Sequence, residues 1–240
     1  MNQDSPVGAT RFGIIGTGRI TRRLVADLQS TDGVRVTALA SRTAERARWY
    51  ADHYGISAAV EGYDSLLTRE DVDAVYISLP PSLHQQWAER AAEQGKTLLC
   101  EKPLALSAAQ AESIDAACRK HAVRWLDATA WLHHERTDAF AQWVESGRLG
   151  DVGHLSASVS FYQPFQSNDH RLDPALGGGC LLDLGWYAAG LVRVASGRLP
   201  GAVYADAVMD HGVPQRVTAM MWFADGATAT LSCGYDTATR

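Results

Sequence analysis

Three short motifs in this chain carry residue types that could take part in chemistry. The first lies between an apolar run at residues 11–15 and a segment with helical spacing at residues 19–28, and it reads Gly16-Thr17-Gly18-Arg19-Ile20. In a strand-turn-helix unit the first glycine permits the tight turn, the second lets the backbone approach a pyrophosphate, and the helix N-terminus favours the anion. The placement therefore predicts a dinucleotide-binding loop, although Thr21 stands where Gly or Ala would allow the closest packing of helix on strand.

The end of the next strand indicates which dinucleotide would bind. In doubly wound folds that bind NAD, an Asp or Glu at this place holds the ribose 2′-hydroxyl, but this chain has Ser41-Arg42. There is no carboxylate here to repel a 2′-phosphate, and a guanidinium pairs well with one. We therefore predict NADP rather than NAD, and the alternative is that Arg42 is a solvated residue at a helix start.

The other two motifs carry residues suited to proton and hydride chemistry. Glu101-Lys102 directly follows an apolar run at residues 97–100, and open α/β sheets bind ligands at the carboxyl ends of their parallel strands. Asp183 and Tyr187 follow a run of three glycines and stand four residues apart, on one face of a predicted helix. Each motif by itself also has a structural interpretation. Lys102 could lie in a surface turn, Asp183 could be an ordinary aspartate in the first turn of a helix, and Tyr187 could be a core tyrosine.

Strands that alternate with helices must position these residues. The first half contains five predicted strands, at 11–15, 34–40, 72–79, 97–100 and 123–126. Helices follow several of them, with N-caps expected at Thr43, Ser82 and Ser107. This alternation predicts an α/β fold in which residues 1–127 form a doubly wound parallel sheet, a Rossmann-type NAD(P)-binding domain.

The second half has a different pattern. Four β-like runs and two helical segments, near 137–146 and 181–195, follow one another from residue 128 to residue 240. Residues 128–240 are therefore expected to form an α+β domain for substrate binding and oligomerisation, with a mainly antiparallel sheet.

The composition is that of a folded globular protein. The 240 residues are 46% hydrophobic and 20% charged, with a net charge of −5 and no basic stripe, which excludes disordered and fibrous classes and argues against nucleic acid as a partner. No leader pattern is present and no run approaches the ~20 apolar residues of a membrane span, so we expect a cytoplasmic protein that does not bind membranes. The four cysteines are widely separated and are expected to be reduced thiols. His133 and His134 lack metal-ligand spacing, and we expect no metal.

In this order, Glu-Lys-Pro and Gly-Gly-Gly-x-Leu-x-Asp-x-Gly-x-Tyr resemble the motifs of the glucose-fructose oxidoreductase / inositol dehydrogenase / rhizopine-catabolism (Gfo/Idh/MocA) family. The tyrosine form of the last motif resembles the branch with dihydrodiol dehydrogenase and anhydrofructose reductase. The resemblance implies a Rossmann domain followed by an α+β domain whose sheet makes a homo-oligomer contact. It also implies hydride transfer between NADP and a sugar, polyol or dihydrodiol hydroxyl or carbonyl.

The same resemblance implies roles for individual residues. Lys102 would bind near the nicotinamide and the reacting oxygen, Tyr187 would donate or accept the proton, and Asp183 would orient the substrate or polarise that pair. Cofactor contacts are expected from two further segments, which contain Leu79, Pro80, His84 and Glu101.

Some positions depart from the family pattern and leave alternatives open. Pro81 stands where Asn is usual and Leu132 where Arg is usual, so these cofactor contacts cannot be carried over. The resemblance also implies more sheet and a terminal segment after residue 240, so we expect a C-terminally truncated, incomplete second domain. A non-catalytic NAD(P)-binding sensor or partner subunit, and an NAD-dependent glycosidase of the same fold, are the alternatives to an oxidoreductase. The motifs do not determine the substrate.

Overall fold

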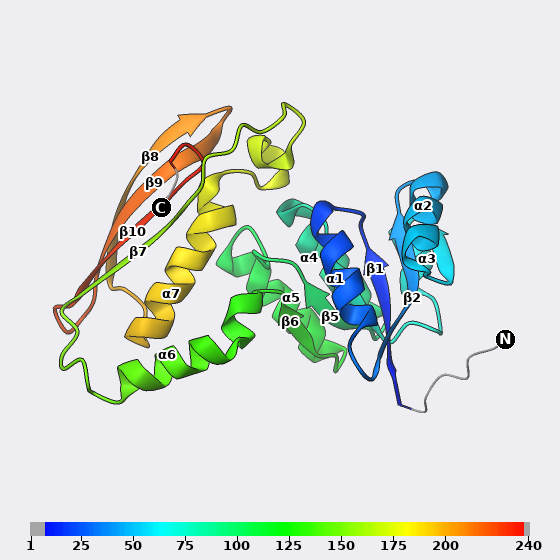
Figure 1. The fold of residues 1–240 in the computed structure, drawn as a ribbon, viewed down its shortest axis with the longest axis horizontal. Helices are drawn as coiled ribbons and strands as arrows, with labels where there is room; N and C mark the ends of the chain where they lie inside the picture. Colours follow the sequence, from blue (N-terminus) through cyan, green and yellow to red (C-terminus); the bar gives the residue numbers. More distant parts are fainter. Residues whose placement is uncertain (1–7, 238–240) are drawn as a thin grey trace. The chain divides into compact units, whose positions relative to one another are not determined.

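The computed structural model describes residues 8–237, which divide into two compact units, one up to Ala128 and one from Thr129 (Figure 1). Each unit is built on its own sheet and has its own buried core. The first unit contains the Gly16-Thr17-Gly18 loop and Lys102, and the second contains Asp183 and Tyr187.

The first unit is a doubly wound parallel sheet. Its six strands lie in the order β3-β2-β1-β4-β5-β6, and every pair is parallel. The strands are β1 (Thr10–Ile15), β2 (Val34–Ser41), β3 (Ala58–Glu61), β4 (Ala74–Ile77), β5 (Thr97–Cys100) and β6 (Trp125–Asp127). The chain reverses its direction of winding between the adjacent strands β1 and β4, which is where such sheets bind ligands, beyond the carboxyl ends of the strands.

Five helices cover the two faces of this sheet. They are α1 (Arg19–Gln29), α2 (Ala44–Tyr54), α3 (Tyr63–Leu67), α4 (His84–Glu93) and α5 (Ala108–Lys120). Because successive strand residues point to opposite faces, Ile14 packs in one core with Val25 of α1, whereas Ile15 packs in the other with Ala88 of α4. The predicted doubly wound sheet is confirmed.

Local signals account for some helix starts and fail at others. Thr43 and Ser107 cap α2 and α5 as predicted, since each side chain accepts a backbone N–H three residues ahead. The cap predicted at Ser82 is wrong: Pro81–Leu83 form a 3₁₀ turn, and α4 begins after it without a side-chain cap. The sequence analysis also missed β3 and α3. The strand has four residues, Ala-Ala-Val-Glu, which do not alternate apolar with polar types although their burial alternates, and the helix has only five residues.

The second unit pairs helices with a four-stranded sheet in the order β7-β10-β9-β8. The strands are β7 (His154–Ser160), β8 (Ala202–Asp210), β9 (Val213–Trp222) and β10 (Thr228–Gly234), and the helices are α6 (Glu135–Glu145) and α7 (Trp186–Ser196). The pairs β8–β9 and β9–β10 are antiparallel, and β7–β10 is parallel, so the sheet is mixed but mainly antiparallel. His211 and Gly212 both have positive φ at the tip of the β8–β9 hairpin, as a tight two-residue turn requires.

One face of this sheet carries the core. Leu231 and Cys233 of β10 are buried together with Ala188 and Val192 of α7. Within the described residues, one stretch of helical turns, Pro174–Ser196, is long and apolar enough by length and composition to cross a membrane. This is weak evidence, because helices in the cores of globular domains meet the same criterion, and residues of this stretch belong to the core.

Candidate functional site

The loop after β1 has the conformation of a dinucleotide-binding turn. Gly16 has a φ of +103°, and a Cβ atom on it would lie 2.7 Å from the Ser78 carbonyl oxygen, so no other residue fits without displacement. Gly18 is the N-cap of α1; it provides no side-chain cap, and the first turn, with Arg19 and Ile20, contains no acidic residue. The first N–H groups of α1 therefore lack a side-chain acceptor, which suits a helix N-terminus that binds an anion.

The threonine that departs from the glycine fingerprint is accommodated by a polar contact. Thr21 is fully buried, and its Oγ1 lies 2.7 Å from Oγ of Ser78, just after β4. Ser78 in turn donates to the carbonyl oxygen of Ile15 over 3.1 Å. Thr21 thus connects the start of α1 to the ends of β1 and β4, and the departure does not open the loop.

An arginine that the sequence reading missed holds the same loop from α2. Arg46 donates to Oγ1 of Thr17 over 2.6 Å and to its carbonyl oxygen over 3.1 Å, and the Tyr50 hydroxyl donates to that carbonyl over 2.9 Å. Arg42 lies four residues before Arg46, just outside α2, and is exposed after the buried Ser41. The signal that could have pointed to Arg46 is its place in the first turn of the helix that follows β2.

The predicted cofactor residues after β4 and β5 are joined through a buried histidine. His84 is fully buried; its Nε2 lies 2.8 Å from the Leu79 carbonyl oxygen and its Nδ1 lies 2.9 Å from that of Pro103. The imidazole ring of His84 thus bridges two backbone segments, the one that contains Pro80 and the one that contains Lys102. Lys102 is followed by a cis peptide bond to Pro103.

Glu101 has a partner on the neighbouring strand. The hydroxyl of Tyr76, a fully buried residue of β4, donates to Oε1 of Glu101 over 2.5 Å, and the Lys102 N–H donates to Oε2 over 3.2 Å. Burial raises the pKa of Glu101, and the bonds from Tyr76 and Lys102 oppose that rise. Both carboxylate oxygens of Glu101 therefore accept hydrogen bonds.

In the second unit, Asp183 lies in a single π-helical turn (Leu181–Gly185) that leads directly into α7. Such turns are rare in proteins as a whole, and those that occur often lie at functional sites. Oδ2 of Asp183 accepts from Arg171 Nε over 2.7 Å and from the Tyr235 hydroxyl over 3.1 Å. Burial lowers the pKa of Arg171, but the charge of Asp183, its hydrogen bond and the charges of Asp169 and Tyr235 together outweigh this effect and leave the pKa raised. Arg171 and Tyr235 are partners that sequence spacing did not reveal.

The glycine run before Asp183 is required by close packing of the chain. A Cβ atom on Gly178 would lie 2.6 Å from the Arg171 carbonyl oxygen, and one on Gly179 would lie 2.5 Å from Pro214. The loop that carries Arg171 therefore packs directly on this run. Tyr187 follows in the first turn of α7, four residues after Asp183.

Two residues near the start of this unit have structural contacts. Nδ1 of His134 accepts from the Arg136 N–H over 3.1 Å and so caps α6. Trp131 packs against Gly190 of α7, where a Cβ atom would lie 2.8 Å from the indole. Both side chains therefore make structural contacts within the second unit.

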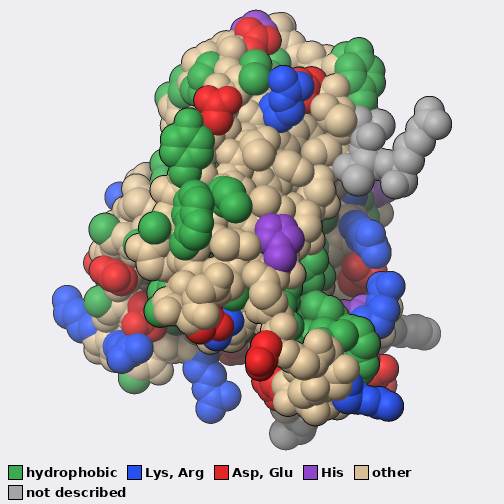
Figure 2. All heavy atoms as spheres, turned by 90° about the vertical axis from the view of Figure 1, so that its left-hand side faces the viewer, with side chains coloured by type: hydrophobic (Ala, Val, Ile, Leu, Met, Phe, Trp, Pro, Cys, Tyr) green, Lys and Arg blue, Asp and Glu red, His purple; other side chains and the backbone are tan. Residues whose placement is uncertain are grey.

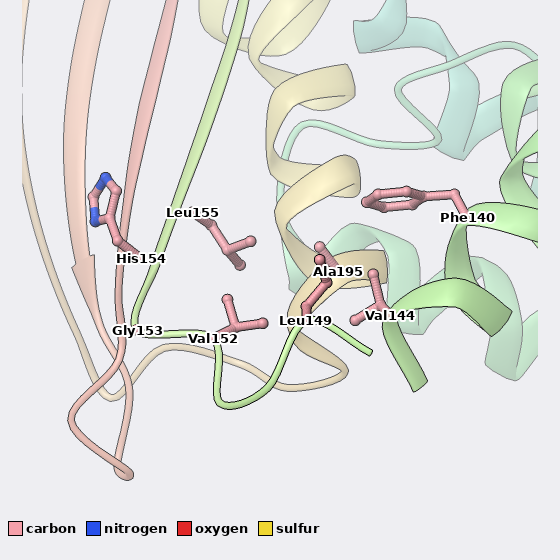
Figure 3. Close-up of a pocket in the computed structure, with 8 residues that line it drawn as sticks. All are labelled: Phe140, Val144, Leu149, Val152, Gly153, His154, Leu155 and Ala195. Atoms are coloured by element: carbon pink, nitrogen blue, oxygen red, sulfur yellow. The ribbon is translucent and has the colours of Figure 1, made fainter. Parts of the chain in front are cut away.

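A hollow of about 310 Å³ lies elsewhere in the second unit (Figure 3). Its walls come from α6, the end of α7 and the segment that leads into β7, and they are mostly apolar: Phe140, Val144, Leu149, Val152, Gly153, His154, Leu155 and Ala195. It contains none of the predicted site residues. Among residues 8–237 no group of three or more His, Cys, Asp or Glu side chains is arranged to hold a metal ion.

Comparison with known proteins agrees with this architecture. Residues 10–127 match the model of an oxidoreductase family with an NAD-binding Rossmann fold (GFO/IDH/MocA), and residues 137–240 match the C-terminal domain of the same family. The chain therefore belongs to the GFO/IDH/MocA family. This membership confirms the predicted family and the prediction of an NAD(P)-dependent oxidoreductase.

Several relatives have named activities. A D-xylose 1-dehydrogenase (NADP(+)) of Haloferax volcanii is 36% identical over 94% of this chain and 70% of its own length. A trans-1,2-dihydrobenzene-1,2-diol dehydrogenase of Xenopus laevis is 30% identical over 93% of this chain and 68% of its own. Among solved structures, the 3-ketoreductase KijD10 of Actinomadura kijaniata, in complex with NADP and TDP-benzene, is 34% identical with a TM-score of 0.85, covering 96% of this chain and 71% of that one. NADP in two of these names agrees with the predicted cofactor.

Proposed function

We propose that this protein transfers a hydride between NADP and a hydroxyl or carbonyl carbon of a sugar, polyol or dihydrodiol. The observation that carries the proposal is the nucleotide-type loop of the first unit, which Arg46 holds and which leads into a helix N-terminus without a side-chain cap. The helix start of the second unit, with Asp183 and Tyr187, supplies residue types suited to proton transfer. The relatives support the substrate class, since they are named for D-xylose and for a dihydrobenzene diol.

The residues of the first unit fit a 2′-phosphorylated dinucleotide. The first N–H groups of α1 suit the pyrophosphate, and Arg42 and Arg46 supply positive charge beyond β2, which ends in Ser41-Arg42 and not in an Asp or Glu. We assign Gly16, Thr17, Gly18, Arg19, Ile20, Ser41, Arg42, Leu79, Pro80, Glu101 and Lys102 to cofactor binding, as the sequence predicts, and we add Arg46. When bound, NADP supplies the hydride acceptor or donor.

In the proposed reaction Tyr187 exchanges the proton at the substrate oxygen, because a hydride that moves at carbon requires a proton to move at oxygen. Lys102 holds that oxygen and balances its developing negative charge. Asp183, anchored by Arg171 and Tyr235, orients the substrate. Structures of KijD10 variants with a tyrosine changed to phenylalanine or a lysine changed to alanine match the residue types that we assign.

The outer face of the second sheet supports homo-oligomer formation. Small hydroxyl side chains of β7 and β10 pair across it, such as Ser158 with Ser232, and Tyr204 and Trp222 are 69% and 41% exposed on β8 and β9. Figure 2 shows few charged side chains in the middle of this face. We propose that a second copy of the chain covers it. In sedimentation velocity, Trp222→Glu should then dissociate an oligomer, and a wild-type monomer at micromolar concentration would refute this point.

Cofactor choice is tested by titration with NADPH and NADH, followed by tryptophan fluorescence. We expect NADPH to bind at least tenfold more tightly, a difference of about 1.4 kcal/mol. Arg42→Gln and Arg46→Gln should each reduce that ratio, and Arg48→Gln, at an exposed arginine of α2, should leave it unchanged. Equal binding of the two cofactors would refute the assignment of the arginines.

Turnover is tested with NADP⁺ and either D-xylose or trans-1,2-dihydrobenzene-1,2-diol, followed at 340 nm. Tyr187→Phe should lower kcat by ~10²–10⁴, the range for loss of a general acid-base group. Tyr162→Phe is the matched control, because Tyr162 is 70% exposed and has no assigned role. Full turnover by Tyr187→Phe would refute the assigned proton transfer.

A further inference from the structure

The backbone around Lys102 is held by side chains on both sides of that residue. On the N-terminal side, the Lys102 N–H donates to Oε2 of Glu101 over 3.2 Å. On the C-terminal side, the carbonyl oxygen of Pro103 lies 2.9 Å from Nδ1 of His84. The position from which the lysine side chain starts is therefore set by what holds Glu101 and His84.

Glu101 is held from β4. Its other oxygen, Oε1, accepts from the Tyr76 hydroxyl over 2.5 Å, and Tyr76 is fully buried. Because one carboxylate oxygen is fixed by Tyr76 and the other accepts the Lys102 N–H, the carboxylate transmits the position of β4 to the lysine backbone.

His84 is held by the backbone segment that follows β4. Its Nε2 lies 2.8 Å from the Leu79 carbonyl oxygen, and the ring is fully buried. A neutral imidazole donates one N–H and an imidazolium donates two. In either state the ring therefore hydrogen-bonds to at least one of the two backbone segments. With both ring nitrogens facing backbone carbonyls, His84 does not act as the direct cofactor contact that the sequence predicted.

We propose that Tyr76 and His84 are positioning residues that together fix the position of Lys102 beyond the carboxyl ends of β4 and β5. Through Lys102 they determine how tightly the nicotinamide half of the cofactor binds. The inference rests on the proposed function for its cofactor. Neither residue touches the cofactor or the substrate in this scheme, since both are buried and act through Glu101 and Pro103.

A spectroscopic test reports on Lys102 without any ligand. The chain has three lysines, Lys96, Lys102 and Lys120, so reductive methylation with ¹³C-formaldehyde gives three lysine signals, and Lys102→Arg assigns the one of interest. Tyr76→Phe and His84→Gln should each shift the Lys102 signal and leave those of Lys96 and Lys120 in place. The matched control is Thr37→Val, which removes another buried hydrogen bond, to the Asp71 carbonyl oxygen at 2.7 Å.

A binding test separates the two halves of the cofactor. NADPH contains the nicotinamide, whereas 2′,5′-ADP contains only the 2′-phosphorylated adenosine half. Tyr76→Phe and His84→Gln should weaken NADPH binding at least tenfold and change the Kd of 2′,5′-ADP by less than twofold. Thr37→Val should change neither Kd, although it lowers the melting temperature.

Two results would overturn the inference. One is a folded Tyr76→Phe or His84→Gln variant whose Lys102 signal does not move, and the other is a variant that weakens NADPH and 2′,5′-ADP equally, as a general loss of structure would. A wild-type protein that binds neither ligand refutes the proposed function instead, and the Lys102 signal then decides the inference by itself.

Discussion

Replacing Arg171 with glutamine removes one partner of a mostly buried ion pair. The Arg171 Nε to Asp183 Oδ2 distance is 2.7 Å, and the two side chains are 26% and 16% exposed. Loss of one partner of a fully buried pair costs ~3–5 kcal/mol because the other charge is left without compensation. Since Arg171 is partly solvated and Tyr235 still donates to Asp183, we expect a loss of about 2–3 kcal/mol in the unfolding free energy of the second unit.

The double variant provides the sharper measurement. Asp183→Asn alone also breaks the pair, but Arg171→Gln with Asp183→Asn removes both charges and leaves neither uncompensated. The double variant should therefore cost less than the sum of the two single variants by about 1–3 kcal/mol. Urea-dependent hydrogen exchange of β10 reports on the second unit alone, because β10 belongs to its core.

A surface pair in the same unit is the matched control. Arg198 and Asp225 also form an ion pair, but their side chains are 43% and 46% exposed, so Arg198→Gln should cost at most ~1 kcal/mol. If Arg171→Gln costs no more than Arg198→Gln, or if the double variant is additive, then Asp183 is not anchored as described.

Two further results are expected. Gly16→Ala should lower stability by about 2–4 kcal/mol and abolish NADPH binding, because the new Cβ meets Ser78 at a positive φ; Gly55→Ala, also at positive φ but with open space around it, should cost only ~1–2 kcal/mol in urea unfolding. Burial lowers the pKa of His84, so its neutral form is favoured in the folded state; stability from this group is present above pH ~6.5 and is lost as the pH falls through the lower folded-state pKa. The melting temperature should therefore fall more between pH 7.5 and 5.5 in the wild type than in His84→Gln, and parallel curves would contradict this.

Local sequence was sufficient for the features that depend on near neighbours. Thr43 and Ser107 cap helices through a backbone N–H three residues away, and the glycine loop follows a strand and opens a helix. These features are readable because the interacting groups are set by spacing along the chain. Ser82 shows the limit of such reading, since the proline before it starts a 3₁₀ turn and the helix begins later.

The sequence by itself determined the doubly wound sheet and the nucleotide-type loop that follows its first strand. Only the tertiary structure decided the partners: Arg46 contacts a threonine 29 positions away, Tyr76 a glutamate 25 positions away, and Tyr235 an aspartate 52 positions away. Periodicity fixes which face of an element is buried, but not which polar groups meet across a sheet edge or between a loop and a strand. That choice depends on packing and on the requirement that buried polar atoms be paired, and both are set by the whole fold.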